Sequence, residues 1–200
     1  MPSHPQSSGP QRVILAMTGA SGAAYALGLL QALIQSTHIQ THLIISNTAA
    51  SILELEAGIL PAQLSMSRVI IHDYDNTAAP PASGSWIHHG MIICPCSMAS
   101  LANIRHGTGH HLIHRAADVT LKEKRPLILV PRETPLNIIQ LENMLGLARA
   151  GAQIVPACPG FYHRPKTIQD LINQLVGRIL DQLGIEHQLT PRWGMENDLG

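Results

Sequence analysis

Short apolar runs alternate with segments of helical periodicity along most of this 200-residue chain. The runs at residues 13–17, 42–45, 91–94 and 127–130 are largely apolar, and each has the length of a strand rather than of a helix. Strands of this kind must be covered on both faces, and strands that alternate with helices form parallel sheets. The pattern therefore predicts a doubly wound parallel sheet in a three-layer α/β/α arrangement.

The same periodicities predict the remaining elements. Ser46 stands in the N-cap position of a helix that continues to Glu56. Most of residues 57–86 is predicted to be loop, with a candidate strand at 68–71. A short strand is predicted at residues 153–155, and further helices at residues 24–34, 97–105, 113–124, 136–149 and 168–183.

Composition limits the class of protein. Nearly half of the residues are hydrophobic, which suffices for one core, so we expect a single domain over residues 12–186. Residues 1–11 are rich in Pro, Ser, Gln and Gly and are expected to form a mobile tail, and residues 187–200 are expected to form a C-terminal tail that closes over the site. Thirteen basic residues balance thirteen acidic ones, so neither nucleic acid nor an anionic membrane is an expected partner.

The compartment and the oligomeric state are also expectations from composition. No apolar run approaches the roughly 20 residues that cross a bilayer, and no signal-peptide pattern opens the chain, so we expect a cytoplasmic protein. Cys94 and Cys96 are too close in sequence for an unstrained disulfide and are read as reduced thiols. Few residues are charged for a chain of this size, which favours burial of surface in a homo-oligomer.

Four segments follow predicted strands, where doubly wound folds bind their ligands: residues 18–22, 46–47, 95–98 and 131–134. Gly19 and Gly22 bracket a tight turn at the start of a helix, whose free N–H groups favour a phosphate or a polar ring edge. The chain has neither the dinucleotide fingerprint nor a P-loop. By elimination, a mononucleotide such as FMN fits better than NAD or ATP, although the turn could also serve packing alone.

Serines and charged residues are further candidates for binding a ligand or for acid/base catalysis. Ser97 and Ser100 could hold a flavin with their hydroxyl groups or only cap the helix that they begin. Arg132 and Glu133 could pair with each other or act as a phosphate clamp beside an acid/base group. Lys122 could belong to a solvated helix end, and Arg115 and Asp118 are spaced to pair on one helix face.

A histidine cluster comprises His106, His110, His111 and His114. No metal site is expected there, because glycines interrupt the helical spacing and the cluster contains no Cys, Asp or Glu. We interpret it as a surface or interface cluster. Cys96 is not expected to be a nucleophile, because the local sequence supplies no positioned base.

Seven segments, considered by their order and spacing, carry a resemblance: residues 18–23, 94–98, 115–119, 122–123, 131–135, 141–144 and 161–165. Together they resemble the UbiX/Pad1 family of flavin prenyltransferases, and the match runs from Arg12 to Trp193. The resemblance implies a flavodoxin-like fold in a homo-dodecamer, with FMN held between subunits. It implies transfer of dimethylallyl from its monophosphate to N5 and C6 of reduced FMN. The prenylated FMN then serves a UbiD-type decarboxylase.

The resemblance also implies residue roles. Ser21, Glu56, Lys122 and Glu133 take catalytic positions, with Glu56 near the reacting flavin edge and Ser21 as a possible proton relay. Flavin contacts fall on Gly19, Ala20, Ser21, Ser46, Ser97, Ser100 and Arg132. Contacts to dimethylallyl phosphate or its surroundings fall on Arg115, Lys122, Arg132, Tyr162, Arg178 and Trp193. The sequence departs from the family pattern at Asn47, where Lys is usual, and at His110 and His111.

The chemistry of the implied reaction agrees with these residue types. The departing phosphate gains negative charge, which Lys122, Arg132 and Arg178 can hold. The chain lacks the aspartate-rich motif that carries Mg²⁺ in diphosphate-dependent enzymes, so a metal-independent reaction is expected. Glu133 or the released phosphate is favoured over Glu56 as acceptor of the C6 proton.

Two alternatives stay open at this stage. One is an FMN-dependent decarboxylase of a cysteine-containing substrate, whose P-A-S-A-N-T loop is matched here only by residues 80–85, without the Asn. The other is an FMN carrier without chemistry.

Overall fold

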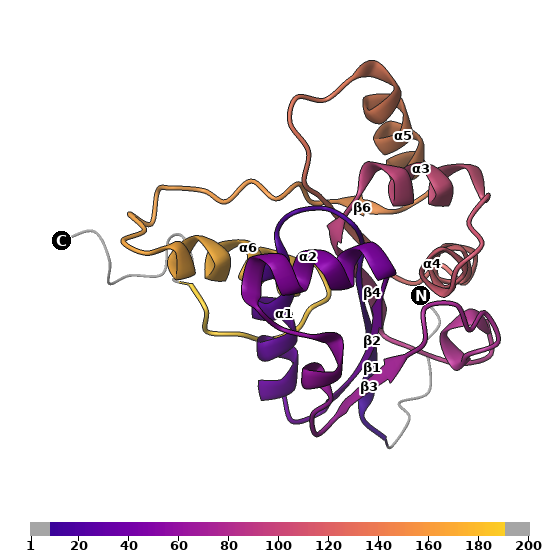
Figure 1. Cartoon of the computed structure of the whole chain (residues 1–200), viewed down its shortest axis with the longest axis horizontal. Coiled ribbons are helices and arrows are strands. Elements are labelled where there is room, and N and C mark those ends of the chain that lie inside the picture. Colours follow the sequence, from indigo (N-terminus) through magenta and orange to yellow (C-terminus); the bar gives the residue numbers. More distant parts are fainter. Residues whose placement is uncertain (1–8, 191–200) are drawn as a thin grey trace.

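The computed structural model describes residues 9–190 and contains one six-stranded parallel sheet with helices on both faces (Figure 1). The strand order is β3-β2-β1-β4-β5-β6, so the direction of winding reverses between β1 and β4. The predicted doubly wound, flavodoxin-like fold is confirmed. The strands are β1 (Gln11–Met17), β2 (Ile39–Ile45), β3 (Val69–His72), β4 (Gly90–Cys96), β5 (Leu127–Pro131) and β6 (Gln153–Ile154).

Within residues 9–190, six α-helices cover the sheet, three on each face (Figure 1). One face carries α1 (Ala23–Gln35), α2 (Asn47–Ala57) and α6 (Ile168–Gln182). The other face carries α3 (Met98–His106), α4 (Leu112–Lys122) and α5 (Ile138–Arg149). Two short 3₁₀ helices, η1 (Pro61–Leu64) and η2 (Pro80–Ala82), lie in the segment that was predicted to be mostly loop.

Alternate residues of each central strand enter two separate cores, because successive side chains of a strand point to opposite faces. Val13 and Leu15 pack into the core under α1 and α6, whereas Ile14 and Ala16 pack into the core under α3 and α4. All four side chains are fully buried. This explains why the strands read as continuous apolar runs in the sequence.

Some boundaries differ from those predicted. β2 begins at Ile39 rather than at residue 42, and its polar residues Thr41 and His42 are buried, which hydrophobicity alone could not indicate. α5 begins at Ile138 rather than at residue 136, because Asn137 and Gln140 form a capping box that fixes the first turn. The candidate strand at 68–71 is confirmed as β3, at an edge of the sheet.

Candidate active site

Three strand ends are held together by hydrogen bonds at the point where the strand order reverses. The backbone N–H and the hydroxyl of Thr18 both donate to the carbonyl oxygen of Pro95, at 3.1 and 3.0 Å. The Thr18 hydroxyl accepts from the N–H of Ser97 at 2.7 Å, and the N–H of Ser46 donates to the carbonyl oxygen of Met17. This frame joins the ends of β1, β2 and β4. Thr18 lies in a segment that the sequence singled out, but its clamping role was not predicted.

The turn between β1 and α1 requires glycine at both bracketing positions. Gly22 has a φ of 119° and caps α1, a conformation that residues with a Cβ rarely adopt. A Cβ on Gly19 would lie 2.6 Å from Cγ2 of Thr48, so the turn can approach α2 closely only with glycine there. The turn is therefore shaped by backbone conformation and by packing against α2.

A carboxylate of the protein occupies the first turn of α1. Oε2 of Glu56 accepts hydrogen bonds from the N–H groups of Gly22 at 3.0 Å and Ala23 at 2.8 Å. Desolvation alone would raise the pKa of Glu56, but hydrogen bonds from the Ser21 side chain, Gly22 and Ala23, with the charge of Arg132, lower it below its usual range. The sequence predicted that the N–H groups at the start of this helix face a ligand. In the structure, those of Gly22 and Ala23 donate to the ionised carboxylate of Glu56.

Arg132 reaches the same turn from the end of β5. Its Nε donates to the carbonyl oxygen of Ser21 at 3.2 Å. Glu133 accepts a hydrogen bond from the N–H of Thr134 instead, and within residues 9–190 it forms no ion pair with Arg132. The fold thus brings together three of the predicted site residues, Ser21, Glu56 and Arg132.

The predicted N-cap role of Ser46 is confirmed, and Ser97, for which flavin contact and capping were both open, also caps its helix. Oγ of Ser46 accepts from the N–H of Ala49 at 3.1 Å and begins α2. Oγ of Ser97 accepts from the N–H of Ser100 at 3.2 Å, and the Ser97 hydroxyl donates to the Ser100 hydroxyl. Both Ser97 and Ser100 are half-buried beside the strand-end frame. Their hydroxyls therefore combine a capping role with a position where a ligand could contact them.

Tyr162 and Arg178 form a second group, on and beside α6. The Tyr162 hydroxyl accepts from the amide of Gln174 at 3.5 Å, and Gln174 lies one helical turn before Arg178. The side chain of Arg178 is 59% exposed and contacts Asp181 at 3.4 Å. The two residues that the resemblance assigned to the donor phosphate thus lie along the same stretch of helix. Trp193, assigned with them, lies outside the described residues.

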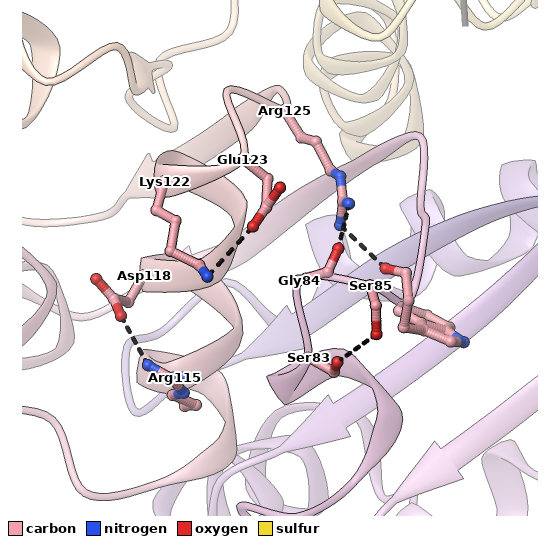
Figure 2. Close-up of polar contacts among 9 residues, drawn as sticks. Ser83, Gly84, Ser85, Arg115, Asp118, Lys122, Glu123 and Arg125 are labelled. Carbon is pink, nitrogen blue, oxygen red and sulfur yellow. Dashed lines mark hydrogen bonds and ion pairs between the residues drawn. The ribbon is translucent and has the colours of Figure 1, made fainter.

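The remaining predicted cations lie on α4, each beside a carboxylate (Figure 2). Arg115 pairs with Asp118 at 3.0 Å, as its spacing predicted, and Lys122 pairs with Glu123 at 3.2 Å. Just beyond them, Arg125 donates to the carbonyl oxygens of Gly84 and Trp86, before β4 begins (Figure 2).

Lys122 is therefore near the amino ends of β4 and β5, whereas Arg132 follows the carboxyl end of β5. The five residues of β5 span about 16 Å at the rise of a strand. A single chain does not bring Lys122 to the group formed by Ser21, Glu56 and Arg132.

The histidine cluster is divided among separate contacts. His106 bonds to Asn143, whereas His111 pairs with Asp75 at 3.0 Å and stacks on Tyr74. His114 is buried. In the part of the chain that the structure describes, no group of three or more His, Cys, Asp or Glu side chains is placed to hold a metal ion.

The cysteines are unpaired thiols. Cys94 and Cys96 are fully buried in β4, and Cys158 is exposed. Burial raises the pKa of Cys96 to about 12 and that of Cys94 further, so neither supplies a thiolate near neutral pH. Among residues 9–190, no helix is long and apolar enough to cross a membrane.

The sheet topology, the glycine turn at the reversal point and the polar groups around it define a nucleotide-binding class of flavodoxin-like fold. The family model described as "Flavoprotein" matches residues 1–180. Flavin prenyltransferase UbiX of Pseudomonas aeruginosa is 46% identical over 95% of this chain and 97% of its own length. The chain belongs to the flavoprotein family, and within it to the UbiX flavin prenyltransferases.

Solved structures agree with this assignment. The crystal structure of AnUbiX (PadA1) in complex with FMN and dimethylallyl pyrophosphate has a TM-score of 0.89 and 43% identity, and the match covers 92% of this chain and 97% of that one. A dodecameric FMN-dependent UbiX-like decarboxylase from Escherichia coli O157:H7 has a TM-score of 0.88 and 45% identity, covering 92% and 99%.

Proposed function

We propose that this protein is a flavin prenyltransferase that joins a dimethylallyl group, taken from dimethylallyl monophosphate, to N5 and C6 of reduced FMN. The observation that carries the proposal is the convergence of Ser21, Glu56 and Arg132 at the reversal point of the sheet. Relatives that are 46% identical over nearly the whole chain bear the name of this activity.

The residues around the reversal point fit FMN. Arg132 supplies a cation for the flavin phosphate, and Ser97 and Ser100 supply half-buried hydroxyls for polar atoms of the flavin. Gly19 lets the turn pack closely against Thr48 of α2, and the backbone of Gly19 and Ala20 is the part of the turn that we assign to flavin contact. Because Glu56 already occupies the start of α1, that helix end would not hold the FMN phosphate. When bound, reduced FMN supplies the electron-rich atoms that capture the allyl carbon.

Two carboxylates take different roles because their surroundings differ. The hydrogen bonds that lower the pKa of Glu56 make it a weak base, so it orients Ser21 and balances positive charge beside the flavin. Glu133 is exposed on the loop after β5, where it or the released phosphate accepts the C6 proton. Ser21 lies between Glu56 and Arg132 and relays that proton.

The donor phosphate requires cationic side chains, but within one subunit Lys122 on α4 lies far from Arg132. We therefore propose that a neighbouring subunit of a homo-dodecamer completes the site with Lys122 and Arg115, and that Tyr162 and Arg178 also bind the phosphate. Cationic side chains balance the charge of the leaving group, so the reaction needs no metal ion. A dodecameric relative supports this assembly.

The product is proposed to serve a UbiD-type decarboxylase in the cytoplasm, in quinone synthesis or in breakdown of aromatic acids. The two alternatives from the sequence have less support. Residues 80–85, the nearest match to the decarboxylase loop, lack its Asn, and Gly84 is bound by Arg125 near the amino end of β4, away from Ser21. A carrier would leave the cations of α4 and α6 without a role.

The test is anaerobic incubation of the purified protein with reduced FMN and prenyl phosphates of several chain lengths, monophosphate and diphosphate. A flavin product whose mass has increased by one dimethylallyl group, formed without added metal, is the expected result. In a separate incubation with oxidised FMN and a cysteine-terminated peptide, oxidation and decarboxylation of the peptide would favour the first alternative. FMN that binds and is recovered unchanged would favour a carrier.

A further inference from the structure

Asp181 contacts both α6 and the segment that follows this helix. One oxygen of its carboxylate lies 3.4 Å from Nη1 of Arg178, and the other lies 3.2 Å from Nε2 of His187. Arg178 is on α6, whereas His187 belongs to the segment after that helix. A single carboxylate thus contacts both the proposed donor-binding arginine and the start of the C-terminal segment.

The hydrogen bonds fix the tautomer of His187. Its Nδ1 accepts a hydrogen bond from the N–H of Leu189 at 3.3 Å, so Nδ1 carries no proton. In a neutral imidazole the proton is then on Nε2, which donates to Asp181. The N–H of Leu189 therefore donates to His187, and His187 and Arg178 both donate to the carboxylate of Asp181, which links the two.

The His187–Asp181 end of this group of hydrogen bonds is buried against α6. The His187 side chain is only 6% exposed and that of Asp181 is 21% exposed, whereas Arg178 is 59% exposed. A Cβ on Gly177 would lie 2.7 Å from Cε1 of His187, so the imidazole can lie against α6 only because residue 177 is glycine. His187, at the buried end of these hydrogen bonds, is closely packed, whereas the guanidinium of Arg178 at the other end is exposed.

We propose that Asp181 and His187 are positioning residues that hold Arg178 in the geometry for binding the phosphate of the prenyl donor. This rests on the proposed function, in which Arg178 binds that phosphate. Asp181 contacts one N–H group of a guanidinium that has five, and the others are left to face a ligand. Holding a long side chain in place before binding removes part of the entropy cost of ordering it.

A double-mutant cycle on the full-length protein tests this directly. Initial rates are measured with reduced FMN saturating and dimethylallyl monophosphate varied, for wild type, Asp181→Asn, Arg178→Ala and the double variant. Asp181→Asn is expected to lower kcat/KM for the donor about tenfold, chiefly through KM, as when a hydrogen bond to a charged group is lost. In the Arg178→Ala background the same substitution is expected to change kcat/KM less than twofold, because its effect passes through Arg178.

Matched variants separate positioning from folding. Asp170→Asn removes another carboxylate from α6, one that accepts hydrogen bonds from Lys166 and Thr167, and is expected to leave KM for the donor unchanged. His187→Gln, which can still donate to Asp181, is expected to retain more activity than His187→Ala. FMN affinity is expected to be the same in all these variants.

The outcomes are distinct. Losses that multiply, so that Asp181→Asn costs the same factor with and without Arg178, would overturn the inference while leaving the enzyme's activity established. Full donor affinity in Asp181→Asn would also overturn it. Absence of prenyl transfer by the wild type would instead refute the proposed function, and this inference with it.

Discussion

The guanidinium of Arg132 hydrogen-bonds to the carbonyl oxygen of Ser21 at 3.2 Å, across a separation of 111 residues. The contact joins the loop after β5 to the turn after β1, which the sheet order places on either side of β4. A charged side chain on a backbone oxygen fixes both loops at once. The position of the turn therefore depends on Arg132 as well as on its own glycines.

Separate substitutions of the two arginines are expected to divide FMN binding from prenyl transfer. Arg178→Ala should bind FMN normally and transfer the prenyl group about a hundredfold more slowly, because one contact to a growing negative charge is lost. Arg132→Ala should weaken both FMN binding and prenyl transfer, because Arg132 is assigned to the proposed flavin site and holds the carbonyl oxygen of Ser21. Flavin titration and single-turnover rates measure the two effects. Loss of FMN binding in Arg178→Ala, with full transfer at saturating flavin, would contradict this division.

A bulky residue at position 97 is expected to abolish FMN binding. Ser97→Leu fills the space beside the strand-end frame and removes the cap of α3, which by itself costs about 1 kcal/mol of stability. Asn137→Ala is a matched control, because it removes the cap of α5 away from the frame. Equilibrium dialysis with FMN should show loss of binding only for Ser97→Leu. Unchanged affinity in that variant would count against the assigned flavin site.

Activity is expected to need two subunits at each site. Lys122→Ala and Arg132→Ala should each be nearly inactive alone, because each removes a cation from every site. Oligomers reassembled from a mixture of the two should regain activity, since some sites then combine an intact Lys122 from one subunit with an intact Arg132 from its neighbour. Light scattering should report a large homo-oligomer throughout. A mixture no more active than its components would indicate that one chain supplies both residues.

Stability is expected to fall between pH 7 and pH 4 because of buried histidines. Burial, followed by the neighbouring charges of His72 and Arg12, lowers the pKa of His42 to about 4, and burial with Arg125 lowers that of His88 to about 4. The unfolded chain, with a pKa near 6.5, binds more protons in this range, so each histidine contributes up to about 3 kcal/mol that is present above pH 6.5 and lost toward pH 4.

Thermal unfolding at several pH values measures this loss. His42→Gln and His88→Gln should flatten the pH dependence, whereas His38→Gln, at an exposed position, should leave it unchanged. Equal slopes for all three variants would contradict the role of the buried pair.

Metal removal is expected to leave activity intact. His106 contacts Asn143 and His111 contacts Asp75, so joint replacement of the four clustered histidines, 106, 110, 111 and 114, by Gln should alter stability or assembly before catalysis. Dialysis against a chelator, followed by the prenylation assay without added metal, measures this. Activity that disappears with the chelator and returns with a divalent ion would overturn the metal-independent mechanism.

Local patterns predicted much of this structure. Ser46 and Ser97 were recognised as helix caps because capping depends on residues three positions apart. The fold class followed from apolar runs, because buried parallel strands require them. By contrast, Glu56 reaches Ala23 over a separation of 33 residues, and only the tertiary fold shows that it fills the helix end. The role of Asp181 could not be predicted for the same reason. An acidic residue on a helix surface does not indicate that it contacts His187 in the segment after the helix.

The carboxylate of Glu56 at the start of α1 has one more consequence. An unliganded loop with free N–H groups usually fluctuates, and a ligand that orders it loses affinity to that ordering. Here Glu56 accepts hydrogen bonds from those N–H groups, so the turn is expected to keep its shape as flavin binds to and leaves the proposed site. An enzyme whose flavin leaves as product must release and rebind it in every cycle, and a docking surface that stays assembled lets this exchange proceed without refolding.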